Sequence, residues 1–150
     1  MKGLGTALVT PFTKEGKVDY ESLGQLIEHQ VAGGTDYLVI LGTTSEIPTL
    51  THKEQDIIIE YVVQKVAGRI PLVLGIGGNS TAAVVERIEE LKEQLVAHFA
   101  AILSVTPYYN RPQQEGLYQH FCAVAEASPV PVILYNVPKR TGVNLLPETT

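Results

Sequence analysis

Short apolar runs alternate with longer segments of helical periodicity along this chain of 150 residues. Five of the runs are rich in Val, Ile and Leu and nearly continuous, which is typical of strands buried on both faces. They cover residues 4–10, 37–42, 71–77, 100–106 and 130–136. Strict alternation of such strands with helices favours a parallel sheet covered by helices, and hence an α/β fold.

Residues that begin and end helices separate these runs. Asp19 is placed to cap a helix that Gly33-Gly34 closes, and Thr51 with Glu54 has the spacing of a capping box. Further helices are expected from residue 79 or 80 to 95, from 113 to 127, and from Pro147 onwards.

Two architectures accommodate this order of elements. One is a five-stranded doubly wound sheet, and the other is the first five strands of a (β/α)8 barrel. A complete barrel needs about 250 residues. Length alone therefore favours the doubly wound sheet, in a single domain, since no linker or repeat interrupts the pattern.

The composition excludes several classes of protein. A formal net charge of −5 without Lys/Arg clusters gives no electrostatic reason to expect nucleic acid as a partner. The single cysteine, Cys122, cannot form an intrachain disulfide and suits a reducing cytoplasm. The sequence has no signal-peptide pattern and no run of about 20 apolar residues, so we expect a soluble cytoplasmic protein without membrane contact.

Polar side chains cluster where each predicted strand ends. They include Thr10, residues 42–46, residues 75–80, residues 106–110, Tyr135, Asn136 and Arg140. Both architectures bring the carboxyl ends of parallel strands to one edge of the sheet. Hydroxyls, phenols, amides and a guanidinium, without an obvious set of metal ligands, indicate chemistry on a small molecule that carries a carboxylate. We therefore expect neither a metal nor a cofactor.

Several of these features have alternative interpretations. The segment GTTSE is equally consistent with an ordinary strand-to-helix turn. GIGGNS lacks the G-x-G-x-x-G spacing and the later acidic residue of a dinucleotide site. The four histidines have no ligand spacing, and surface or helix-cap positions are expected for His29, His52, His98 and His120.

Four motifs, in order, resemble those of the dihydrodipicolinate synthase family. They are TALVTPF (6–12), GTTSE (42–46), VTPYYNRPQQEGLYQHF (105–121) and YNVPKRTG (135–142). The resemblance covers residues 1–150 and implies the family's (β/α)8 barrel, which overrides the length argument. The chain is then expected to supply the first five strands and four helices of a single barrel domain, a partial barrel whose remainder lies outside residues 1–150.

Members of that family condense pyruvate with aspartate semialdehyde on the diaminopimelate route to lysine. A lysine forms a Schiff base with the pyruvate ketone, and the resulting enamine attacks the aldehyde. The resemblance implies that Tyr135 is the general acid/base and that Thr43 links it to Tyr109, which reaches a neighbouring subunit's site. It also implies that Thr44 holds the pyruvate carboxylate and that Arg140 receives the carboxylate of the semialdehyde.

The resemblance also implies a homotetramer, a dimer of dimers, with Tyr108 at the tight-dimer interface. The family's Schiff-base lysine follows strand six, outside residues 1–150, and Lys139 is expected on a solvated loop that lacks a desolvating wall. The chain alone is therefore expected to be inactive.

Two alternatives remain open on the sequence. One is a related pyruvate-dependent lyase, such as an N-acetylneuraminate lyase or a 2-keto-3-deoxy sugar-acid aldolase, although N-acetylneuraminate lyases lack the KRTG-type continuation. The other is a non-catalytic half-barrel, whose open edge strands would invite pairing or aggregation.

Two departures from the family pattern bear on the site. Ser45 replaces the usual Gly of GTTGE, which would be costly if that position has a positive φ angle. The passage over residues 92–104 is longer than usual and lacks its customary Gly, so the register of the fourth strand is uncertain from sequence.

We predict weak or absent feedback inhibition by lysine. His52, Asn79 and Tyr108 match the family's lysine site, but Gln55 and Ala83 stand where many inhibited members carry His and Glu. A full-length assay that shows strong inhibition at sub-millimolar lysine would contradict this prediction.

Overall fold

A computed structural model describes all residues from Met1 to Thr150. Its strands follow the order β1-β2-β3-β4-β5, and the pairs β1–β2, β2–β3 and β4–β5 are parallel. The predicted parallel α/β fold is therefore confirmed. The chain divides into two compact units, Met1–Leu74 and Gly75–Thr150.

Every strand is shorter than the apolar run that predicted it. The strands are β1 Gly5–Ala7, β2 Tyr37–Ile40, β3 Leu72–Gly75, β4 Ala101–Val105 and β5 Val132–Tyr135. The α-helices are α1 Tyr20–Ala32, α2 His52–Val66, α3 Thr81–Glu90, α4 Lys92–His98, α5 Gln114–Ala127 and α6 Pro138–Thr141. Three 3-10 turns complete the chain, namely η1 Thr43–Ser45, η2 Ile47–Thr49 and η3 Pro147–Thr149. None of the helices has the length and apolarity that crossing a membrane requires.

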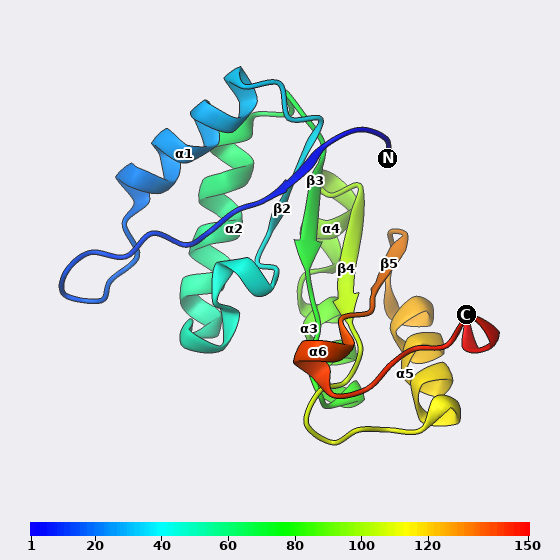
Figure 1. The fold of residues 1–150 in the computed structure, drawn as a ribbon. Helices are drawn as coiled ribbons and strands as arrows, with labels where there is room; N and C mark the ends of the chain where they lie inside the picture. Colours follow the sequence, from blue (N-terminus) through cyan, green and yellow to red (C-terminus); the bar gives the residue numbers. More distant parts are fainter. The chain divides into compact units, whose positions relative to one another are not determined.

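In the first unit, α1 and α2 lie side by side (Figure 1). Their apolar faces bury Ile27 and Val62 completely, and the rings of Tyr20 and Tyr61 meet with centroids 5.3 Å apart. Arg69, just after α2, donates two hydrogen bonds of 2.8 and 2.9 Å to the carboxylate of Glu28 on α1. Burial of two apolar faces provides most of the stabilisation, since exposed ion pairs contribute little.

The helix ends of the first unit were correctly predicted. The Asp19 side chain accepts a hydrogen bond of 3.0 Å from the backbone N–H of Ser22 and so caps α1. Thr51 and Glu54 form a complete capping box at the start of α2. Such caps satisfy backbone donors that a helix leaves free at its first turn.

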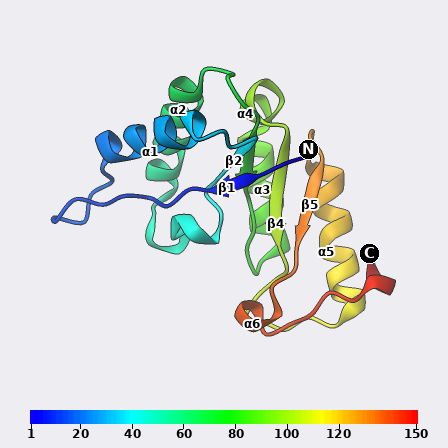
Figure 2. The same ribbon diagram turned by 45° about the horizontal axis from the view of Figure 1, so that its top comes forward.

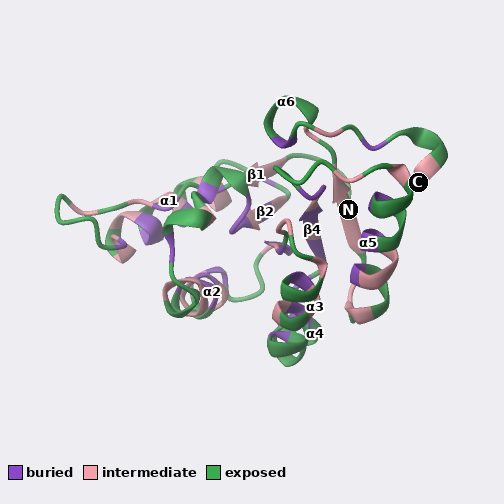
Figure 3. Ribbon diagram, turned by 90° about the horizontal axis from the view of Figure 1, so that it is seen from below, coloured by how far each residue is buried: buried purple, intermediate pink, exposed green.

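In the second unit, β4 and β5 run side by side and α5 lies along β5 (Figure 2). Directly after β3, the N–H of Ile76 donates to the carbonyl of Leu103 on β4. One face of α5 is buried and the opposite face is exposed, as Figure 3 shows by colour. The buried face contributes Leu117 and Phe121, which pack with Leu145 and the half-buried Leu134.

The single helix expected between β3 and β4 consists of two. α3 ends at Glu90 and α4 begins at Lys92, because Leu91 has φ −97° and ψ 8° and leaves the helical geometry. No Gly or Pro marks this break, which lies between the buried side chains of Ile88 and Leu95. The passage of residues 92–104 thus contains a short separate helix, α4, before β4 begins at Ala101.

Candidate functional site

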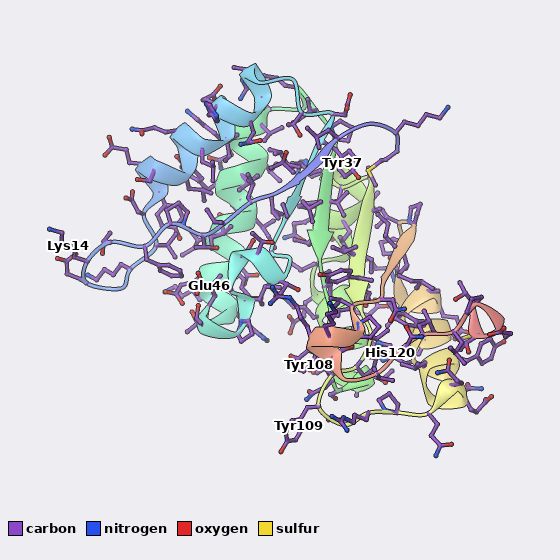
Figure 4. The ribbon with its side chains drawn as sticks, viewed as in Figure 1. Lys14, Tyr37, Glu46, Tyr108, Tyr109 and His120 are labelled. Atoms are coloured by element: carbon purple, nitrogen blue, oxygen red, sulfur yellow. The ribbon has the colours of Figure 1, made fainter.

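The turn after β2 carries two of the predicted site residues. Thr43 and Thr44 occupy η1 and are exposed, whereas the next residue, Ser45, is 3% exposed. Ser45 does not have the positive φ angle that would have made serine costly at this position. The positive φ angles of this turn are at Leu41 (50°) and Glu46 (56°). Figure 4 shows Glu46 on this turn.

The ends of β4 and β5 form a second part of the candidate site. Val105 pairs in register with Tyr135, and the N–H of Thr106 donates a hydrogen bond of 3.1 Å to the Tyr135 carbonyl. Paired residues of parallel strands project to the same face of the sheet. Tyr135 is therefore a half-buried phenol at the carboxyl edge, on the face that Val105 also occupies.

Tyr109 is held in a strained conformation four residues after Val105, the last residue of β4. Its φ angle is 71°, and the N–H of Asn110 donates to the carbonyl of Tyr108 at 2.8 Å, which is the hydrogen bond of a γ-turn. Tyr109 is 89% exposed and Tyr108 is 37% exposed. In Figure 4 the Tyr109 side chain projects away from the rest of the unit. A non-glycine residue held in this region is typical of functional positions.

Arg140 lies on the one-turn helix α6, where a loop had been expected. Backbone hydrogen bonds of 2.9 Å from Arg140 to Val137 and from Gly142 to Pro138 close this turn. Gly142 has φ 73°, and a Cβ there would lie 3.0 Å from Nε of Arg111. Lys139 and Arg140 are both exposed, and their charged side chains face solvent. The backbone hydrogen bonds, rather than these side chains, therefore hold the turn together.

Asn136 anchors the returning chain rather than facing a ligand. Its Nδ2 donates to Oδ1 of Asn144 at 2.8 Å, and its Oδ1 accepts from the N–H of Leu145 at 3.1 Å. The buried hydroxyl of Thr141 adds a hydrogen bond of 2.9 Å to the carbonyl of Val143. These bonds fix the segment that presents Arg140.

The sequence places Asn110 at a strand end but does not identify its partner, and it gives no role to Arg111 of the same loop after β4. Asn110 donates from Nδ2 to the carbonyl of Asn79 at 2.8 Å and so connects the loops that follow β3 and β4. Arg111, with φ 51°, brings its guanidinium against Gly142. The motif YYNRP contains both residues, but their partners are distant in sequence and could not be identified from it.

The predicted site residues are distributed over both units. Thr43, Thr44 and the exposed His52 belong to the first unit, whereas Asn79, Tyr108, Tyr109, Tyr135 and Arg140 belong to the second. Within the second unit, the strand-end pair and the connected loops bring Tyr135, Tyr109 and Asn79 onto neighbouring segments. The roles of all eight residues, including the relay from Thr43 to Tyr109, stay predictions.

Comparison with known proteins identifies relatives across the whole chain. The model of the Dihydrodipicolinate synthetase family matches residues 1–150. The 4-hydroxy-tetrahydrodipicolinate synthase of Parabacteroides distasonis is 58% identical over 150 residues, covering 100% of this chain and 50% of the relative. The synthase of the same name from Flavobacterium psychrophilum is 56% identical over 147 residues, covering 98% of this chain and 49% of the relative.

A crystal structure of the dihydrodipicolinate synthase from Acinetobacter baumannii, chloride inhibited and complexed with pyruvate, matches with a TM-score of 0.92 at 46% identity. The match covers 98% of this chain and 50% of that one. The chain thus spans about half the length of the relatives it matches. The fold is accordingly that of a partial (β/α)8 barrel, and the doubly wound alternative is excluded.

One histidine of the second unit is buried, against the expectation of a surface or helix-cap position. His120 on α5 is 3% exposed, and its Nδ1 lies 2.9 Å from Oγ1 of Thr81 on α3. Its ring meets that of Phe121 edge-on, and Nε2 is buried without a protein partner. Burial lowers the pKa of His120, because a charged imidazolium would lose its hydration there.

We predict that His120 makes the protein less stable in acid. Its folded-state pKa lies below the value of about 6.5 in an unfolded chain, so unfolding takes up a proton between the two pKa values. The contribution of His120 is complete above about pH 6.5, and it is lost as the pH falls through the folded-state pKa. Urea unfolding between pH 5 and 7.5 should show a smaller decline of the unfolding free energy for His120→Asn than for the wild type.

The exposed His98 provides the matched control. His98→Asn should keep the pH dependence of the wild type. An equal decline in the wild type and in His120→Asn would show that His120 titrates as an exposed histidine does.

Proposed function

Because the chain belongs to the Dihydrodipicolinate synthetase family, we propose that it forms about half of a barrel that condenses pyruvate with aspartate semialdehyde. The nucleophile is a lysine outside residues 1–150, which forms a Schiff base with the ketone of pyruvate with loss of water. Loss of a proton from the pyruvate methyl carbon gives the enamine, which attacks the aldehyde carbon. The name of the relatives and the pyruvate in the Acinetobacter baumannii crystal support this reaction.

The observation that supports this function most strongly is the strand-end pair of β4 and β5. The register Val105↔Tyr135 and the hydrogen bond from Thr106 hold a phenol at the carboxyl edge of parallel strands. Forming the Schiff base moves protons onto the ketone oxygen and off the amine nitrogen. A positioned phenol such as Tyr135 can donate and accept these protons.

Thr43 and Tyr109 complete the proposed proton relay. Both are exposed, and Tyr109 projects from a strained turn that costs of the order of 1–3 kcal/mol to maintain. A phenol that is 89% exposed on a rigid turn suits a group that serves a neighbouring subunit. We therefore propose a homo-oligomer, a dimer of dimers, with Tyr108 and Tyr109 at the closer interface.

The two carboxylates of the substrates require separate anchors. Thr44, the middle residue of the 3-10 turn η1, offers an exposed hydroxyl to the carboxylate of pyruvate. Arg140 offers a guanidinium to the carboxylate of the semialdehyde, since its planar fork donates to both oxygens at once. The turn around Arg140 is fixed by Asn136 and Thr141, so its backbone is ordered before a substrate binds.

Borohydride trapping tests the proposed function. A complete barrel that contains residues 1–150, incubated with pyruvate and borohydride, should gain the mass of one reduced pyruvate adduct. The 150-residue chain by itself should gain none, because none of its lysines is buried in a desolvating environment. A complete barrel without an adduct would reject the proposed function, and an adduct on the 150-residue chain would show that one of its own lysines is competent.

The adjacent residues Arg140 and Lys139 provide a test of the proposed anchor for the semialdehyde carboxylate. Arg140→Ala should reduce kcat/KM for aspartate semialdehyde about 10- to 100-fold, since a charged hydrogen-bonded pair contributes roughly 1.5–3 kcal/mol. The pyruvate adduct should still form, because it precedes semialdehyde binding. Lys139→Ala, on the same exposed turn, should leave both steps unchanged. Equal effects of the two substitutions would indicate a general electrostatic contribution rather than a specific anchor.

A further inference from the structure

Two buried hydroxyls connect the turn after β2 to the end of β1. Oγ of Ser45 donates a hydrogen bond of 2.7 Å to the carbonyl of Leu8, and Oγ1 of Thr10 donates one of 2.8 Å to the carbonyl of Ser45. The exposed fractions are 3% for Ser45, 6% for Thr10 and 3% for Leu8. The two bonds run in opposite directions between the same two segments, and we call them the hydroxyl clasp.

The clasp begins where the sheet ladder between β1 and β2 ends. The last register pair is Ala7↔Val39, after which the N–H of Leu8 still donates to the carbonyl of Val39. The chain then leaves strand geometry at Leu41, with φ 50°. At this point the Ser45 hydroxyl donates to the carbonyl of Leu8. A side-chain hydrogen bond thus takes over where the backbone hydrogen bonds between the two segments end.

The turn held by the clasp is strained at both ends. Leu41 and Glu46 have φ angles of 50° and 56°, in the left-handed region that non-glycine residues rarely adopt. Such conformations persist only where the surrounding structure determines them. The internal bonds of the turn, Ser45 N–H to Gly42 and Glu46 N–H to Thr43, measure 3.0 and 3.2 Å. The clasp bonds, by contrast, are buried and join this turn to the segment that follows β1.

We propose that Ser45 and Thr10 are positioning residues for the binding of the pyruvate carboxylate, which rests on the proposed function. Thr44 immediately precedes Ser45, and both lie in η1. The backbone of Ser45 cannot shift without breaking a buried hydrogen bond at its side chain or at its carbonyl. The hydroxyl of Thr44, which is exposed and does not belong to the clasp, is thereby presented from a fixed backbone.

The test compares pyruvate kinetics in a complete barrel that contains residues 1–150. Ser45→Ala and Thr10→Val each delete one clasp donor and keep a side chain of similar size. Each should raise KM for pyruvate about 10-fold or more, because small displacements of a positioning group are costly. The rate of reduced-adduct formation at saturating pyruvate should change much less. Thr10→Ser, which keeps the donor, should restore the wild-type KM.

Thr49 provides a matched control on the neighbouring turn. Its hydroxyl also donates to a backbone carbonyl, that of Glu46, at 2.8 Å, but it is exposed. Thr49→Val should leave KM for pyruvate unchanged. Thermal unfolding of all variants identifies any that fail to fold, and Thr10→Val and Ser45→Ala test the clasp independently of each other.

The possible outcomes separate the two proposals. If the wild type forms the adduct and both clasp variants keep its KM for pyruvate while losing only thermal stability, the clasp is structural and the inference is rejected. If the wild type itself forms no adduct, the proposed function is rejected and the inference with it. A selective rise in KM for the two clasp variants, reversed in Thr10→Ser, supports both.

Discussion

The parallel pairing of β4 with β5 determines where the candidate site residues after these two strands lie. In the second unit, the register Val105↔Tyr135 and the hydrogen bond from Thr106 to the Tyr135 carbonyl hold two strand ends side by side. The loops that follow, with Tyr109 on one and Arg140 on the other, start from this junction. If the register slipped by one residue, Tyr135 would project to the opposite face of the sheet. The direction in which the Tyr135 side chain projects thus depends on backbone hydrogen bonds rather than on contacts of the phenol itself.

In both units, non-glycine residues with positive φ angles lie near the strand ends, and side-chain hydrogen bonds hold the backbone around them. In the first unit, Leu41 and Glu46 bracket a turn that the Ser45 and Thr10 hydroxyls hold in place. In the second, Tyr109 has a positive φ and the Asn110 side chain ties its loop to Asn79. Strain of this kind is stable only where neighbouring bonds leave the chain no alternative. The exposed hydroxyls and phenols of the site are therefore presented by backbone that cannot easily relax.

Local signals in the sequence were sufficient to predict a helix start where the two residues that form the cap are close in the chain. Asp19 with Ser22 and Thr51 with Glu54 lie three residues apart, and both helix starts were predicted correctly. The break at Leu91 was missed because no Gly or Pro marks it. The burial of His120 was missed because its partner Thr81 is 39 residues away on another helix. Ser45 was considered only as a possible cost, since its hydrogen bond to Leu8 spans 37 residues.

By itself, the sequence determined the alternation of strands and helices, the capping of α1 and α2, and the four motifs that indicated the family. These features depend on hydrophobic periodicity, on bonds between near neighbours and on residue identity, all of which can be read along the chain. Only the tertiary structure decided the register of β4 with β5, the division of α3 from α4 and the hydroxyl clasp. Each of these depends on which distant backbone group satisfies a buried donor or acceptor, and that choice is made by packing rather than by local preference.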